Sequence, residues 1–265
     1  LFPYTTLFRS LPETGWDTDG FAATLAQTAP RLAYLMPDFH NPTGRCMDAA
    51  TRQTITDIAA QTRTTLVVDE TMVDLWFDVP PPPPLAAFNP EATVMTLGSA
   101  GKSFWGGLRL GWIRASSRTI ATLAQTRDTL DLGSPVLEQL ATLWLIENSA
   151  TFLPARRQML AERRDRCGQM LREHFPEWRF QEAEGGLSYW IELPGMLATQ
   201  LAARAETTGI IMGTGTRFGL SGAFDRYLRM PFSLSSPELE EALLRIKPLW
   251  RALNKSVAPV KRSLV

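Results

Sequence analysis

Short apolar runs alternate with helical stretches through the first half of the chain. The runs at residues 31–37, 64–70, 92–99 and 109–115 have the apolar and β-branched content typical of strands. Between the first two runs, residues 47–63 place apolar side chains at helical spacing, with Asp48 near the start. Further helical stretches run from about Ser117 to His174. Strands separated by helices predict an α/β fold with a mostly parallel sheet that is covered on both faces.

The pattern changes near residue 150. A long, arginine-rich amphipathic helix is predicted there, and its charges favour a solvated face. Strands at 185–194 and 226–234, with helices at 196–209 and 236–253, then predict a smaller α+β unit. We therefore expect a larger domain over residues 11–150, a small C-terminal domain over 151–253 and a frayed tail over 254–265.

Composition excludes several function classes. The 265 residues carry 27 basic and 27 acidic side chains, with no basic block to attract nucleic acid or an anionic membrane. No apolar run is long enough to span a membrane. Cys46 and Cys167 match no metal-ligand spacing, so we expect free thiols, a cytoplasmic location and no metal site. Residues 1–10, "LFPYTTLFRS", look like a translated sequencing adapter, and we leave them out of the fold prediction.

Two polar features follow strands in the first domain. "HNPTG" occupies residues 40–44, and Asn41 before a proline is held extended with its side-chain amide free to bond. The alternative is an ordinary Asn-Pro turn. Asp69 ends the strand "TLVVD", where the ligands of open α/β sheets bind, although an aspartate there can also cap a helix.

A third feature surrounds the lysine of "GSAGKSFWGGLRLG". Small neighbours let a ligand approach the backbone closely, and Lys102 in a dry, electropositive pocket would be a nucleophilic amine. Ser99 and Arg109 supply a hydroxyl and a guanidinium suited to a phosphate. In "RYLRMPF", Arg229 leaves a strand beside a proline and is suited to clamp a carboxylate at two points.

Taken together, "NPTG" and the S-x-x-K-x(6)-R-x-G pattern resemble the class I/II aminotransferases, which are fold-type I enzymes dependent on pyridoxal 5'-phosphate. The resemblance spans Leu11 to about Leu253 and implies an incomplete large-domain sheet, because the family's first strands lie upstream of "NPTG". It implies that Asn41 bonds the cofactor's ring oxygen, that Asp69 pairs with its pyridine nitrogen and that Lys102 forms the imine with its aldehyde.

The same resemblance implies that Ser99 and Arg109 hold the cofactor phosphate and that Arg229 binds the carboxylate of an amino-acid ligand. One position departs from the enzymes. Aminotransferases usually carry a tyrosine two or three residues after the ring-nitrogen aspartate, and this chain has Thr71 and Met72, of which Thr71 can donate a single hydrogen bond. The departure predicts inefficient transamination but leaves cofactor binding intact.

Two function classes follow from the resemblance. The first class is the effector-sensing domain of a MocR-type regulator of the GntR group, whose DNA-binding head would lie upstream. It is favoured by the segments "PDFHNPTGR" and "YLRMPFS" and by the absent tyrosine. The alternative is a free-standing cytoplasmic aminotransferase. A third reading, a domain that keeps the fold without using the cofactor, is disfavoured by the intact Lys102 and Asp69. The family usually dimerises, and the apolar segment "LWFDVPPPPPL" suggests a homodimer of the full-length protein.

Overall fold

The structure is a computed structural model, which describes residues 15–219 and 222–257. The interpretation of residues 1–10 therefore lies outside the described residues. The chain divides into two compact units. The first holds most of the residues up to 158, with 184–186 added, and the second holds most of those from 159, with 42–44 added. The boundary falls inside helix α6 (Ser149–His174).

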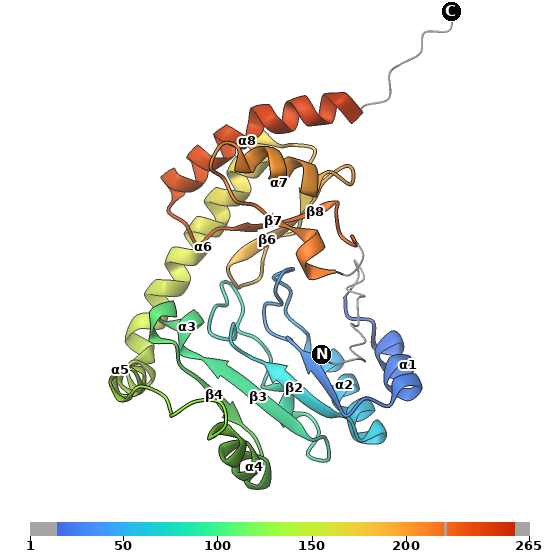
Figure 1. The fold of residues 1–265 in the computed structure, drawn as a ribbon, viewed down its shortest axis with the longest axis vertical. Coiled ribbons are helices and arrows are strands. Elements are labelled where there is room, and N and C mark those ends of the chain that lie inside the picture. The colour runs from blue at the N-terminus through green and yellow to red at the C-terminus, as the bar shows by residue number, and fades with distance from the viewer. Residues whose placement is uncertain (1–14, 220–221, 258–265) are drawn as a thin grey trace, which may run out of the picture. The chain divides into compact units, whose positions relative to one another are not determined.

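A four-stranded sheet forms the centre of the first unit, with strand order β1-β2-β3-β4 (Figure 1). Its first three strands, β1 (Leu32–Leu35), β2 (Thr65–Asp69) and β3 (Val94–Ser99), are parallel. The fourth, β4 (Gly111–Arg114), runs antiparallel to β3. The α/β class and the mostly parallel sheet predicted from the sequence are thereby confirmed.

Helices α1 (Thr18–Thr28) and α2 (Ala49–Thr62) build the core of this unit against one face of the sheet. Phe21, Ile55 and Val68, from α1, α2 and β2, are each at most 3% exposed. Burying a side chain of this size is worth about 1.5–3 kcal/mol, so the cluster holds the two helices on the sheet. Asp48, near the start of the predicted helix, caps α2, because its side chain accepts a hydrogen bond from the Thr51 amide at 2.7 Å.

Short elements connect β3 to β4. Helix α3 (Ala100–Ser103) follows β3 directly, and a 3₁₀ turn, η2 (Gly106–Leu108), precedes β4. A second 3₁₀ turn, η1 (Leu85–Ala87), follows the proline run. Gly98 of β3 lies opposite Trp112 of β4, and a Cβ at Gly98 would come within 2.1 Å of the indole nitrogen. Only glycine leaves room for that ring. Helices α4 (Ser117–Arg127) and α5 (Val136–Glu147) lead on to α6.

The second unit is α+β, as predicted. Its sheet has the order β5-β6-β8-β7 with antiparallel pairs throughout. The strands are β5 (Arg179–Phe180), β6 (Ser188–Glu192), β7 (Gly213–Thr214) and β8 (Tyr227–Pro231). Helix α7 (Ala198–Glu206), the 3₁₀ turn η3 (Gly215–Phe218) and helix α8 (Ser236–Val257) complete it.

The expected tail begins inside a helix. Helix α8 continues through Val257, so Asn254 and the residues just after it are helical rather than frayed. Trp250 and Leu253, each 1% exposed, anchor this end of the helix in the core of the second unit. The ring of Trp178 stacks on Phe175 at 4.1 Å and meets Trp250 edge-on at 5.4 Å. Among residues 15–219 and 222–257, no helix has the length and apolar content needed to cross a membrane.

Candidate functional site

The candidate site is one edge of the first unit's sheet. Because β1, β2 and β3 are parallel, their carboxyl ends meet at this edge, where ligands of open α/β sheets bind. Asp69 is the last residue of β2 and Ser99 the last of β3. Asp69 lies opposite Leu97, two residues before Ser99, so the alternation of strand side chains puts Asp69 and Ser99 on the same face of the sheet.

Asp69 is held by two donors. Its Oδ1 accepts a hydrogen bond from the Thr71 amide at 2.9 Å, and its Oδ2 accepts one from the Tyr34 hydroxyl. The first bond is an Asx turn that bends the chain immediately after β2. A carboxylate has about four lone-pair sites, so the two internal bonds leave capacity for a further partner.

Lys102 lies in α3, three residues after Ser99, and its side chain is exposed. The described residues therefore do not enclose it in the dry pocket that its proposed chemistry calls for. Two polar contacts fix its segment. Arg156 donates from Nη2 to the Lys102 carbonyl at 3.0 Å, and the buried Ser103 hydroxyl donates to Asp74 Oδ2 at 2.6 Å. The second bond ties α3 to the turn that follows Asp69.

Ser99 and Arg109 flank the lysine segment. The Ser99 hydroxyl caps α3 by accepting a hydrogen bond from the Gly101 amide at 3.1 Å. Arg109 is exposed and has φ +51°, a left-handed conformation that is costly for a residue with a Cβ. Such strain is found mainly where the surrounding structure requires it, often at functional sites. Ser99 pairs with Gly111, so both flanking residues lie at the same edge as Asp69.

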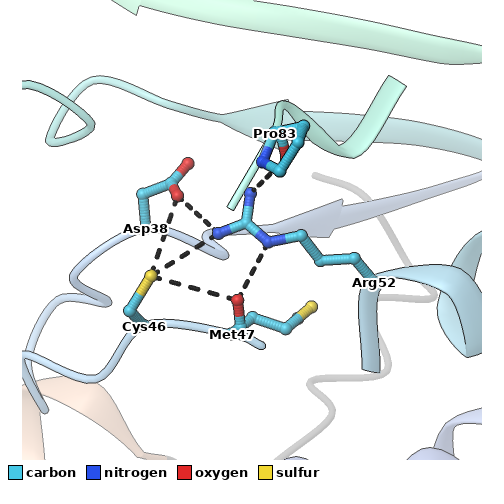
Figure 2. A network of polar contacts seen from close by, with 5 residues as sticks. All are labelled: Asp38, Cys46, Met47, Arg52 and Pro83. Carbon is cyan, nitrogen blue, oxygen red and sulfur yellow. Dashed lines mark hydrogen bonds and ion pairs between the residues drawn. The ribbon is translucent and has the colours of Figure 1, made fainter. Parts of the chain in front are cut away.

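The loop that carries Asn41 follows β1 and is anchored by a buried side chain of α2. Asn41 is exposed, and its amide donates to Met36 Sδ at 3.0 Å. Figure 2 shows the anchor, in which the guanidinium of Arg52 reaches both ends of the loop. Its Nη2 lies 2.6 Å from Asp38 Oδ1 and its Nε donates to the Met47 carbonyl at 2.9 Å. Both charged side chains are completely buried.

The same guanidinium contacts two further groups. Nη1 donates to the Pro83 carbonyl at 3.1 Å, and Nη2 lies 3.5 Å from Cys46 Sγ (Figure 2). Burial raises the pKa of Asp38, against the charge and hydrogen bond of Arg52, which lower it. Burial also raises the pKa of the Cys46 thiol to about 11, with a further contribution from the Asp38 charge. Arg52 thus joins the "HNPTG" loop, α2 and the proline run.

Burial also shifts the pKa of two titratable groups next to the site residues. It lowers the pKa of His40, the neighbour of Asn41, to about 4, so this imidazole is neutral at pH 7. The His40 ring meets Trp16 edge-on at 5.5 Å. Glu70 follows Asp69, and burial, with a smaller contribution from the Asp38 charge, raises its pKa to about 7.

Arg229 belongs to the second unit, where β8 places it opposite Trp190 of β6 and Gly213 of β7. Burial lowers its pKa, and its buried Nε has no hydrogen-bond partner among the described residues. Its neighbour Arg226 is different, because its Nε lies 3.3 Å from Glu192 Oε1. Of these two arginines, Arg229 is the one suited to bind an anion.

The structure therefore brings Asn41, Asp69, Thr71, Ser99, Lys102 and Arg109 to one edge of one sheet. Sequence reasoning missed the residues that support them, chiefly Tyr34, Asp74 and Arg52. Of these three residues, only Arg52 could have been noticed in the sequence, because it is a charged residue among the apolar positions of α2. Among the described residues, no three His, Cys, Asp or Glu side chains group closely enough to hold a metal ion.

The fold and this edge define a class of protein in which an α/β domain presents a lysine, an aspartate, a serine and an arginine at the ends of its central strands. The profile of the family "Aminotransferase class I and II" matches residues 7–246. The chain belongs to this family.

Comparison with solved structures confirms fold type I. LysN, the α-aminoadipate aminotransferase of Thermus thermophilus, was solved in complex with N-(5'-phosphopyridoxyl)-L-leucine. It superimposes with a TM-score of 0.86 at 27% identity, over 93% of this chain and 65% of LysN.

The curated relatives include regulators and enzymes. The uncharacterized HTH-type transcriptional regulator YisV of Bacillus subtilis is 33% identical over 69% of this chain and 39% of YisV. The 2-aminoadipate transaminase of Thermus thermophilus is 29% identical over 94% of this chain and 64% of the transaminase. The chain thus spans between about two fifths and two thirds of the length of these relatives.

Proposed function

We propose that this chain binds pyridoxal 5'-phosphate at the carboxyl edge of its first sheet and that the loaded site binds an amino acid or a related primary amine. One observation carries the proposal. Asp69 and Ser99 end adjacent parallel strands on the same face of the sheet, and Lys102 follows three residues later. These are the acid, hydroxyl and amine that the cofactor's nitrogen, phosphate and aldehyde call for.

The donor set fits the group. Asp69 would hold a proton on the ring nitrogen, and Asn41 would bond the ring oxygen. Thr71 would lie beside these two residues, where its hydroxyl could donate a single hydrogen bond. Ser99 and Arg109 would bind the phosphate, which suits a guanidinium and a hydroxyl. Lys102 is exposed and Asp69 keeps free lone pairs, so the internal contacts leave both side chains able to bind the cofactor.

The chain's own residues support a proton-transfer reaction next to an amine. When bound, pyridoxal phosphate supplies an aldehyde that condenses with amines and a ring that withdraws electrons from the adjacent carbon. With the ligand's amine bound at the site, Lys102 would act as the base that takes and returns a proton at that carbon. Asp69 would keep the ring nitrogen protonated throughout. Arg229, whose buried Nε has no partner among the described residues, would bind the ligand's carboxylate and orient it.

We further propose that the whole protein is a MocR/GntR-type transcriptional regulator in which this domain senses the amine. The similarity to YisV supports this assignment, as does Thr71 at a position where aminotransferases usually carry a tyrosine. DNA would be bound by a separate domain upstream. The second candidate is a free-standing aminotransferase, favoured by the similarity to the 2-aminoadipate transaminase over 94% of this chain.

Borohydride reduction and peptide mapping test the cofactor site. We expect protein reconstituted with pyridoxal phosphate to carry the cofactor mass on Lys102 after reduction, and Lys102→Ala to lose it. Lys255→Ala, which removes an exposed lysine of α8, is the matched control and should label fully. A cofactor mass on another lysine, or on none, would overturn the proposal.

A second experiment separates regulator from enzyme. Protein expressed from the complete reading frame is mixed with single amino acids, and both the cofactor spectrum and keto-acid release are followed. A regulator gives the spectral change with little keto acid, and the amino acid alters its affinity for DNA from its own locus. Multiple turnovers with no DNA binding would establish the aminotransferase instead.

We also propose a cytoplasmic homodimer. The segment "LWFDVPPPPPL" gives less support than its composition suggests, because Leu75 and Leu85 at its two ends are fully buried. Exposed apolar side chains lie instead on α5, where Leu137 is 79% and Leu140 59% exposed. Such a patch is typical of an interaction surface. A monomer in sedimentation of the full-length, cofactor-loaded protein would refute the dimer.

A further inference from the structure

Tyr34 shares a sheet face with the aspartate of the candidate site. It lies in β1 opposite Val67, two residues before Asp69 on β2. Side chains of register partners and of residues two apart point to the same face of a sheet, so Tyr34, Val67 and Asp69 lie on one side. From there the Tyr34 hydroxyl donates to Asp69 Oδ2.

The two donors to Asp69 come from different elements. Thr71, in the turn after β2, supplies a backbone amide to Oδ1, and Tyr34, on the neighbouring strand, supplies its phenol to Oδ2. One donor on each oxygen fixes the plane of the carboxylate, which a single bond would leave free to rotate. The phenol is therefore the only one of the two that a side-chain substitution can remove.

Tyr34 keeps its proton over the working range of pH. Partial burial raises the pKa of the phenol well above its usual value, and the hydrogen bond to Asp69 and the negative charge of Asp69 raise it further. Tyr34 is 56% exposed, so removal of its hydroxyl leaves the packing of β1 intact. Tyr34 is thus a permanent donor whose loss does not threaten the fold.

We propose that Tyr34 is a positioning residue that orients the Asp69 carboxylate and thereby sets how firmly the protein holds the proton on the cofactor's ring nitrogen. This inference rests on the proposed function, since it assigns Asp69 to that nitrogen. It places the second support of Asp69 on β1, seven residues before Asn41, rather than in the segment that follows β2.

Tyr34→Phe tests the inference on protein expressed from the complete reading frame. Two readouts other than activity are measured, the dissociation constant for pyridoxal phosphate and the pH midpoint at which the bound cofactor's ring nitrogen loses its proton, followed by NMR of cofactor labelled with nitrogen-15 in the ring. Loss of the net contribution of one ordinary hydrogen bond predicts roughly three- to tenfold weaker binding. A carboxylate free to rotate also predicts a midpoint at lower pH, because the ring proton is held less firmly.

Tyr189→Phe is the matched control. The Tyr189 hydroxyl also donates to a carboxylate, Glu182 Oε2 at 2.5 Å, but it lies in the second unit. We expect this variant to leave the cofactor affinity and the spectral midpoint unchanged. A Tyr34→Phe protein that matches wild type in both readouts, or whose midpoint moves to higher pH, would overturn the inference.

A cofactor-free measurement tests the contact itself. In Asp69→Asn the negative charge beside Tyr34 is gone, so the phenol should ionise nearer the ordinary tyrosine pKa of about 10, followed by absorbance at 295 nm. Tyr34→Phe in the same background identifies the step by removing it. If Asp69→Asn leaves the ionisation unchanged, the inference fails although the cofactor binds. If wild type carries no cofactor on Lys102, the proposed function fails and the inference falls with it.

Discussion

The buried ion pair under the "HNPTG" loop offers the sharpest test of how the site is held. Arg52→Met keeps most of the side-chain volume and removes the guanidinium. Asp38 is then a buried carboxylate without its cation, and the carbonyls of Met47 and Pro83 lose their donors. Breaking a completely buried pair by removing one partner costs about 3–5 kcal/mol. That is a large fraction of the roughly 5–15 kcal/mol by which a domain is stable.

A double variant shows whether the unpaired charge is the cause. Asp38→Asn combined with Arg52→Met removes both charges, so its cost should fall at least about 1 kcal/mol below the sum of the two single costs. The free energy of unfolding is measured by urea denaturation followed by fluorescence. Arg118→Met, at an exposed arginine of α4, is the control and should change the free energy by about 0.5 kcal/mol or less. A cost below about 1 kcal/mol for Arg52→Met, or strict additivity, would refute the reasoning.

The effect of Arg52→Met should depend on pH. Burial already raises the pKa of Asp38, and loss of Arg52 removes the charge and hydrogen bond that lower it. An acid whose native pKa lies above its unfolded value binds more protons when folded, so stability is present at low pH and is lost as pH rises through that window. The deficit of the variant relative to wild type should therefore be smaller at pH 5 than at pH 8. An equal deficit at both values would exclude an unpaired carboxylate as its source.

Two further substitutions test the electrostatics and anchoring of the site. The pKa of Glu70 is raised from 4.5 to about 7, so its destabilising effect appears as pH rises through that window. Glu70→Gln should therefore be more stable than wild type at pH 8 but equal to it at pH 4. Because this side chain is partly exposed, solvent screening keeps the difference well below the roughly 3 kcal/mol that the full shift would give. Urea denaturation at the two values measures this, and a pH-independent difference would contradict it. Ser103→Ala leaves Asp74 without the hydroxyl donor at 2.6 Å and should lower the free energy of unfolding by about 1–2 kcal/mol. An unchanged urea midpoint would show that this bond contributes nothing.

Strand positions and the residues at strand ends could be predicted because each depends on local pattern. The antiparallel direction of β4 could also have been predicted from the sequence. Only residues 100–110 separate β3 from β4, and a parallel crossover needs about a dozen or more. Helix α1 had its signals too, since Asp17 caps it and Phe21 and Leu25 repeat at helical spacing, yet the sequence prediction left it out.

The supporting contacts could not be predicted because they depend on register and long-range packing. Tyr34 reaches Asp69 only because β1 and β2 pair with Tyr34 opposite Val67, and strand alternation alone fixes no register between strands. Arg52 and Asp38 are 14 residues apart, on a helix and a loop, and no periodicity links them. A charged residue inside a helix usually marks a solvated face, and here it is completely buried.

Each segment of the site is held by polar contacts from another element. Arg52 on α2 holds the loop that carries Asn41, and Tyr34 on β1 holds the carboxylate of Asp69. Arg156 on α6 bonds the carbonyl of Lys102. Loops at strand ends bury little apolar surface of their own, so polar contacts of this kind must fix their geometry. It follows that substitutions of the supports that are not buried, Tyr34 and Arg156, should alter the site's binding before they unfold the sheet, whereas substitutions in the core of α1 and α2 should do the reverse.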